Sequence, residues 1–196
     1  MVAMVTQELG RRERKKAATR QALSDAALRL FAERGYDKVT IAEVAAEADT
    51  AVATVFAHFP AGKDALIFDD GSARRADLEA AVRERPEGTS ILDAVHGYLA
   101  RRGPFIEGMN AEQRTKADLI INTPALRAYA RTLWIGCQDA LVQAVADESG
   151  RDPRDPGVRS LARYVLELPD LIGADDDPRA SLEAAFVHLR LGWPDL

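Results

Sequence analysis

The stretch that decides the fold spans residues 40–63 and reads TIAEVAAEADTAVATVFAHFPAGK. A threonine followed three residues later by Glu43 forms a capping box, which predicts the start of a helix. Val55 and Phe59 lie four residues apart, on one side of a second short helix that Pro60 ends. Two short helices joined by a tight turn are typical of a helix-turn-helix, whose second helix enters the DNA major groove.

These residues resemble the DNA-binding half of the TetR (tetracycline-repressor) family of bacterial regulators. The family pattern is Thr-x-x-x-Ile-Ala, a short gap, and Thr-Leu-Tyr-x-His-Phe-Pro-x-Lys-x-x-Leu. The residues of the chain that correspond to this pattern are Thr40, Val44, Ala45, Thr54, Val55, Phe56, Ala57, His58, Phe59, Pro60, Lys63 and Leu66. There are three departures. Phe56 replaces a tyrosine, Ala51 replaces a capping serine so that Thr50 is the expected cap, and one extra residue precedes Lys63.

The resemblance implies an all-α chain of about nine helices. Residues 1–62 would form a three-helix DNA-binding head, and residues 63–196 a larger helical body for ligand binding and dimerisation. The sequence predicts a loose tail over residues 1–10, a first helix from Arg11 to Gly35, and a fourth helix over residues 63–85. In the body it predicts a long helix from Pro124 to about Glu148.

Charge is unevenly distributed along the 196 residues, although the net charge is −5. Residues 1–20 hold six Lys or Arg and two Glu, whereas residues 61–196 hold seventeen basic and twenty-three acidic residues. Because cations at a helix N-terminus oppose the helix dipole, we interpret this basic arm as facing phosphates. A solvated helix start is the alternative.

We expect DNA contacts from the arm, the turn and the second helix, and His58 and Lys63 are expected to reach phosphates. The second helix carries mostly methyl groups, so sequence would be read through thymine methyls and, by the arm, in the minor groove. The expected DNA-binding residues are Arg12, Lys15, Lys16, Thr40, Thr50, Ala51, Val52, Ala53, Thr54, Phe56, Ala57, His58 and Lys63.

A second resemblance lies in the body. Residues 114–126, RTKADLIINTPAL, and the later GRDPRDP resemble a TetR subgroup whose regulatory domain is described as binding acyl-CoA-like ligands. The effector would then be a small hydrophobic or acyl-CoA-like molecule, with Arg101, Arg102 and Arg114 as anion partners. The alternative is that the expected lining simply fills the core. That lining is Leu92, Val95, His96, Leu99, Phe105, Ile106, Met109, Tyr129, Leu133 and Trp134.

The last two helices are expected to pair with a second copy as a four-helix bundle, which would make the protein a homodimer. Their apolar stripe would alternatively pack on the chain's own body. The expected interface residues are Val158, Leu161, Ala162, Val165, Leu182, Phe186 and Leu189.

Other function classes find little support. The three histidines fall in separate helices without metal-ligand spacing, and no phosphate-binding glycine loop or nucleophile motif occurs, so we expect neither catalysis, cofactor nor metal. One cysteine, Cys137, and the lack of an apolar run of membrane length favour a cytoplasmic protein. The sequence thus predicts a ligand-responsive transcriptional regulator acting as a repressor. The alternative is an all-α carrier or sensor without DNA binding.

Overall fold

The computed structural model describes residues 2–68 and 71–191, with side chains described from residue 10 onward. Every regular element in these ranges is a helix, which confirms the all-α class. The chain divides into two compact units, a head that ends at Phe68 and a body that begins at Asp69.

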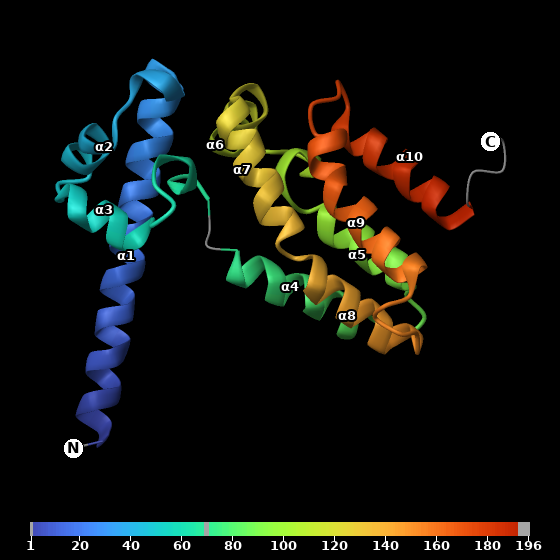
Figure 1. Cartoon of the computed structure of the whole chain (residues 1–196). Helices are drawn as coiled ribbons and strands as arrows, with labels where there is room; N and C mark the ends of the chain where they lie inside the picture. Colours follow the sequence, from blue (N-terminus) through green and yellow to red (C-terminus); the bar gives the residue numbers. More distant parts are fainter. Residues whose placement is uncertain (1, 69–70, 192–196) are drawn as a thin grey trace. The chain divides into compact units, whose positions relative to one another are not determined.

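The head is built around one long helix. Its elements are α1 (Val2–Arg34), η1 (Tyr36–Lys38), α2 (Ile41–Glu47), α3 (Val52–His58) and η2 (Lys63–Ala65). Helices α2 and α3 lie beside the C-terminal half of α1, and its N-terminal half extends beyond them (Figure 1). The chain leaves α1 at Gly35, whose φ of 84° is a conformation that residues with a side chain rarely adopt.

The core of the head joins α1 to the two short helices. Burying each of its phenylalanines stabilises the fold by roughly 1.5–3 kcal/mol. Its fully buried members are Leu23, Ala26, Ala27, Phe31, Val44, Val55, Phe59 and Leu66.

The N-terminal residues differ from the sequence-based expectation. A loose tail over residues 1–10 is wrong for the described part of this segment, because α1 already begins at Val2. Extending a helix that is already formed adds one hydrogen bond for each residue fixed, so propagation is far easier than nucleation. The packed half of α1 therefore supports a helical arm.

The end of the head also differs. A helix over residues 63–85 is wrong, because Lys63–Ala65 form the 3-10 helix η2 and α4 begins only at Ser72. Leu66 and Ile67 are buried in the head, where the Leu66 carbonyl accepts a hydrogen bond from Ser24 Oγ. The compact head thus continues beyond residue 62, the boundary expected from the sequence, to Phe68.

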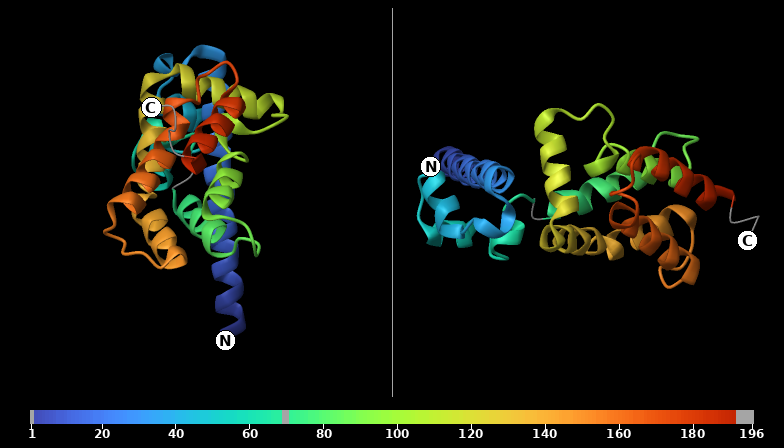
Figure 2. Two further views of the ribbon diagram at one scale, coloured as in Figure 1. Left: turned by 90° about the vertical axis from the view of Figure 1, so that its right-hand side faces the viewer. Right: turned by 90° about the horizontal axis from the view of Figure 1, so that it is seen from above.

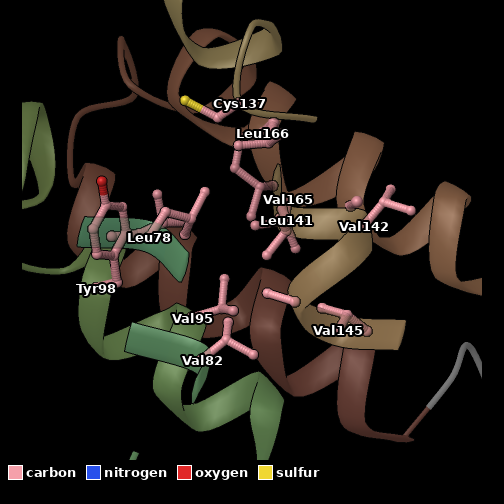
Figure 3. Close-up of a cluster of buried hydrophobic side chains, with 14 of the residues drawn as sticks. Leu78, Val82, Val95, Tyr98, Cys137, Leu141, Val142, Val145, Val165 and Leu166 are labelled. Atoms are coloured by element: carbon pink, nitrogen blue, oxygen red, sulfur yellow. The ribbon is translucent and has the colours of Figure 1, made fainter. Parts of the chain in front are cut away.

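The body is a bundle of helices around one apolar core (Figure 3). Helix α4 packs on α5 and α8, α9 packs on α7 and α8, and α10 rests on α5 and η3. Its elements are α4 (Ser72–Arg83), α5 (Ile91–Leu99), η3 (Gly103–Phe105), α6 (Ala111–Asn122), α7 (Pro124–Ile135), α8 (Gln138–Ser149), α9 (Pro156–Leu171) and α10 (Pro178–Leu191).

The long helix predicted after Pro124 is divided into α7 and α8, and Figure 2 shows the two ribbons as separate helices. The break lies at Gly136 and Cys137, where the Cys137 amide bonds the Trp134 carbonyl at 3.0 Å, three residues back. Cys137 itself is buried in the core, as expected for a small apolar side chain.

Candidate nucleic-acid interface

Helices α2 and α3 form the helix-turn-helix. The Glu43 amide bonds Thr40 Oγ1 at 3.2 Å and the Glu43 carboxylate accepts the Thr40 amide at 2.8 Å, which confirms the capping box. In the turn, Asp49 has a φ of 48°, a left-handed conformation that aspartate tolerates better than most residues. The short turn lets α3 pack on α2 at the edge of the head.

The N-terminus of α3 has no side-chain cap. The residue at the cap position is Ala51, which offers no acceptor, and α3 begins at Val52. The expectation that Thr50 substitutes as a cap is therefore wrong. The Thr50 amide instead bonds the Ala45 carbonyl at 2.9 Å and so helps to close the turn.

Exposure along α3 separates a core side from an outer side. Val55 and Phe59 are buried, and Thr54 and His58 are half-buried. The residues that remain are exposed, and all of them are apolar: Val52, Ala53, Phe56 and Ala57. The helix expected to read bases thus presents an apolar surface to solvent.

Lys63 is turned toward the head. Its Nζ donates to the Tyr36 carbonyl at 2.5 Å and lies 3.9 Å from the centre of the Tyr36 ring. The Tyr36 hydroxyl donates to Asp64, and burial, together with this acidic partner, raises the pKa of Tyr36. In this arrangement Lys63 binds Tyr36 within the head, whereas the sequence pattern predicts an outward contact with a phosphate.

Arg20 joins α1 to the C-terminal end of α3. Its guanidinium donates to the carbonyls of His58 and Phe68, the second at 3.1 Å, and lies 4.0 Å from the centre of the Phe59 ring. The Nδ1 atom of His58 is buried without a hydrogen-bond partner. Sequence reasoning counted Arg20 only as part of the basic arm. Its place in the apolar row that includes Leu23 and Phe31 was the signal for an inward role.

The basic arm lies on the exposed half of α1. Arg12, Lys15 and Lys16 are exposed, as are Arg11 and Arg14, and none of the five forms an ion pair with any described residue. An α-helix is about 10–12 Å wide with its side chains, whereas the minor groove is only about 6 Å wide. As a helix the arm can contact phosphates, but it does not fit the minor groove, which argues against the expected minor-groove reading.

Several of the expected ligand-lining residues belong to the core of the body. Val95, Leu99 and Phe105 are fully buried, and Leu92 and Trp134 pack against the same cluster. The four that remain besides His96 are half-buried around η3, α6 and α7: Ile106, Met109, Tyr129 and Leu133.

His96 faces α10. Its ring packs against Phe186 with ring centres 4.8 Å apart, and its Nε2 lies 3.1 Å from Glu183 Oε1 without hydrogen-bond geometry. Of the expected anion partners, Arg102 is occupied, because it pairs with Asp77 at 2.8 Å and lies over the Tyr98 ring.

No cluster of three or more His, Cys, Asp or Glu residues that could hold a metal ion occurs in the described ranges. None of the helices described here is both long enough and apolar enough to cross a membrane.

Comparison with known proteins gives two matches to family models. Residues 23–69 match the model of bacterial regulatory proteins of the tetR family, and residues 89–168 match the MftR C-terminal domain. The transcriptional regulator TcmR of Streptomyces glaucescens is 31% identical over 152 residues, which cover 74% of the chain and 67% of TcmR. The chain belongs to the TetR family.

This TetR-family protein is a DNA-binding transcriptional regulator of the helix-turn-helix type. MftR of Mycobacterium tuberculosis, assigned as a transcriptional regulator of mycofactocin biosynthesis, is 29% identical over 153 residues, covering 78% of the chain and 77% of MftR. Salmonella enterica GusR superposes with a TM-score of 0.55 at 20% identity, covering 89% of the chain and 92% of GusR, and thus shares the fold.

The regulator's last two helices point their apolar stripes inward. Five of the seven expected interface residues are buried within the protomer, and Leu161 and Leu189 are half-buried against the same core. These side chains pack on the chain's own body, which is the alternative to the expected four-helix interface. The five buried residues are Val158, Ala162, Val165, Leu182 and Phe186.

The outer faces of these helices carry other residues. On α10, Val187 and Leu191 are 46% and 70% exposed, and on α9 Leu171 is 58% exposed. Leu171 and Tyr164 lie in an open groove of about 720 Å³ on the outer side of α9. No expected ligand or interface residue lines this groove, whose other members are Gln138, Pro156, Arg159, Ser160, Arg163 and Glu167.

The capping box gives the regulator's head a predictable pH dependence. The Thr40 amide and then Arg34 Nη2, at 2.6 Å, lower the pKa of Glu43 from 4.5 to about 2. A carboxylate whose pKa is depressed on folding adds stability above its unfolded pKa and loses it as the pH falls toward the folded value. The contribution of Glu43 should therefore disappear between about pH 4.5 and pH 2.

Glu43→Gln tests this prediction, since glutamine can keep the bond to the Thr40 amide but carries no charge. Thermal unfolding is followed by circular dichroism across this pH range. As the pH falls, the unfolding midpoint of the wild type should decrease more steeply than that of Glu43→Gln. Parallel curves would show that the ionised carboxylate is unimportant.

Proposed function

We propose that the regulator is a repressor that binds operator DNA as a homodimer and releases it when a small effector binds the body. The effector class that we propose is an apolar molecule with an anionic end, such as an acyl-CoA. The observation that carries the DNA-binding part is the head. It combines an outward α3 in a helix-turn-helix with five exposed cations on α1 that no described acidic residue neutralises.

A homodimer is supported by what the outer face of α10 exposes. Val187 and Leu191 are large apolar side chains that lie four residues apart on one helix, and the described residues of the protomer do not cover them. Two heads are needed to contact half-sites that lie about 34 Å apart on DNA. We therefore assign the interface to the outer faces of α9 and α10, in place of their inward stripes.

The proposed effector site is the corner where α6 meets η3 and α7. Helix α6 packs on these two elements but contributes no buried residue, and the corner holds the half-buried Ile106, Met109 and Leu133. Arg114 on α6 is exposed and donates to the Met109 carbonyl at 3.1 Å, which leaves guanidinium protons for an anion. An apolar lining with a few polar groups is what small-molecule sites usually have.

The mechanism is a population shift. The effector can weaken DNA binding only by as much as it prefers the released conformation over the DNA-bound one. An acyl chain inserted beneath α6 would separate it from α7 and so favour a body conformation that differs from the one that holds both heads on DNA.

A protection footprint on the DNA that flanks the regulator's own gene tests both parts of the proposal. We expect two protected half-sites about one helical turn apart. Palmitoyl-CoA should then remove the protection over the same concentrations at which Trp134 fluorescence changes. The second tryptophan, Trp193, lies outside the described residues, and Trp193→Phe makes Trp134 the sole reporter.

The outcomes separate the two parts. Absence of protection on flanking DNA, and of any enriched duplex from a random library, would contradict DNA binding and favour a carrier or sensor. Protection that persists at saturating palmitoyl-CoA, with unchanged Trp134 fluorescence, would contradict the proposed effector class. The assignment as a DNA-binding regulator would still hold. Free coenzyme A serves as the control for the acyl chain.

A further inference from the structure

The exposed face of α3 is unusual for a base-reading surface. Val52 and Phe56 are 41% and 47% exposed, lie one turn apart, and are flanked by the exposed methyl groups of Ala53 and Ala57. Single exposed apolar residues are normal, but this is a continuous apolar face on the helix that a helix-turn-helix inserts into the major groove. We therefore expect this face of α3 to contact an apolar group of its binding partner.

The chemistry of the groove identifies that partner. Each base edge in the major groove offers hydrogen-bond donors or acceptors, and thymine alone among the unmodified bases adds an apolar group, its C5 methyl. On α3, only Thr54 and His58 carry polar side chains. Both are half-buried, and the Nδ1 atom of His58 is enclosed.

We propose that the regulator selects its operator by apolar contact with thymine methyls, with Val52 and Phe56 as the specificity-determining residues. This inference rests on the proposed function, since it requires that α3 lies in the major groove of operator DNA. Charge favours DNA over a protein partner for this face, because the same head carries the exposed cations Arg12, Lys15 and Lys16.

A methyl reader has a property that a hydrogen-bonding reader lacks. Deoxyuridine keeps every hydrogen-bonding group of thymine and lacks only the C5 methyl, so it should be rejected. Conversely, 5-methylcytosine carries a methyl at the same ring position, so it should be preferred to cytosine there. The regulator would thus respond to the methyl group itself rather than to the base that carries it.

The test uses the full-length protein and the duplex that it enriches from a random library. Each half-site thymine is replaced singly by deoxyuridine, and affinity is measured at constant salt. Because one buried methyl is worth about 0.8 kcal/mol, each contacted thymine should lose roughly fourfold in affinity on replacement. A duplex with 5-methylcytosine at such a position should be bound more tightly than the same duplex with cytosine there.

Two variants assign the effect to residues. In Phe56→Ala and Val52→Ala the penalty for deoxyuridine should vanish at the position that each side chain contacts, as in a double-mutant cycle. Lys15→Gln is the matched control. It should weaken binding to the thymine and uracil duplexes alike, because a phosphate contact carries no base information.

Each result decides something. Failure to enrich any duplex would overturn the proposed function itself. If the enriched duplex keeps its affinity with deoxyuridine at every half-site position, the methyl readout is overturned. The proposed function as a DNA-binding regulator is then unaffected. The same holds if Phe56→Ala and Val52→Ala leave the penalty or the DNA affinity unchanged, since α3 would then expose these side chains for another partner.

Discussion

Replacing Arg12, Lys15 and Lys16 together with glutamine is expected to weaken operator binding at least about a hundredfold near 0.1 M salt. All three side chains are exposed on the helical arm, without ion-pair partners among the described residues. Each cation that contacts a phosphate releases counterions, so the slope of log affinity against log salt should fall by about 0.9 per lost contact. The three substitutions should therefore reduce the slope by up to about 2.7 for each head.

The helix itself should survive these changes, because glutamine has nearly the helix propensity of lysine and arginine. Circular dichroism and the unfolding midpoint should match those of the wild type. A charge-matched variant of the body, with Arg75, Arg101 and Arg154 replaced by glutamine, controls for net charge, since these side chains are also exposed. If both triple variants show the wild-type salt slope, the arm does not contact phosphates.

The second large effect concerns two neighbours on α10. Phe186 is fully buried in the core of the body, whereas Val187 is almost half exposed. Phe186→Glu would bury an unpaired carboxylate, which costs several kcal/mol and should unfold the body. Val187→Glu should leave the unfolding midpoint of the protomer nearly unchanged but place two charges against each other across a two-fold interface.

Sedimentation velocity with thermal unfolding distinguishes the two results. We expect a dimer for the wild type, a folded monomer for Val187→Glu, and loss of the cooperative transition for Phe186→Glu. Arg75→Glu on α4, at an exposed position far along the chain from α10, is the control and should remain dimeric. A stable dimer of Val187→Glu would exclude the outer face of α10 as the interface.

Local signals made part of the fold predictable. Thr40 caps α2, as its spacing to Glu43 predicts. Ser90 accepts the Asp93 amide at the start of α5, and Asp177 accepts the Ala180 amide at the start of α10. Each of these signals lies within a few residues of the structure that it specifies. The resemblance added the arrangement of head and body helices, which matches to the family models support.

Tertiary contacts decided what sequence reasoning missed. Leu66 fits an amphipathic helix that starts at Lys63, but it is buried in the head, where Ser24 of α1 donates a hydrogen bond to its carbonyl. The sequence alone predicts Lys63 to be an exposed cation, because it does not show that the Tyr36 carbonyl and ring lie beside the ammonium group. The inward direction of Phe186 likewise depends on α5, whose His96 ring packs against it. Periodicity identifies an apolar face, but it does not say which element covers that face.

Helix α6 carries no buried side chain, and under the proposed effector mechanism this would give the regulator an adjustable threshold. A segment with few buried apolar contacts opens locally at a low free-energy cost. An effector that binds only the open form has an apparent dissociation constant equal to its intrinsic value divided by the open fraction. Substitutions that loosen or tighten α6 against α7 would therefore shift the effector concentration at which transcription responds. They would do so without touching either the effector or the DNA, so the same fold can be tuned to scarce or abundant ligands.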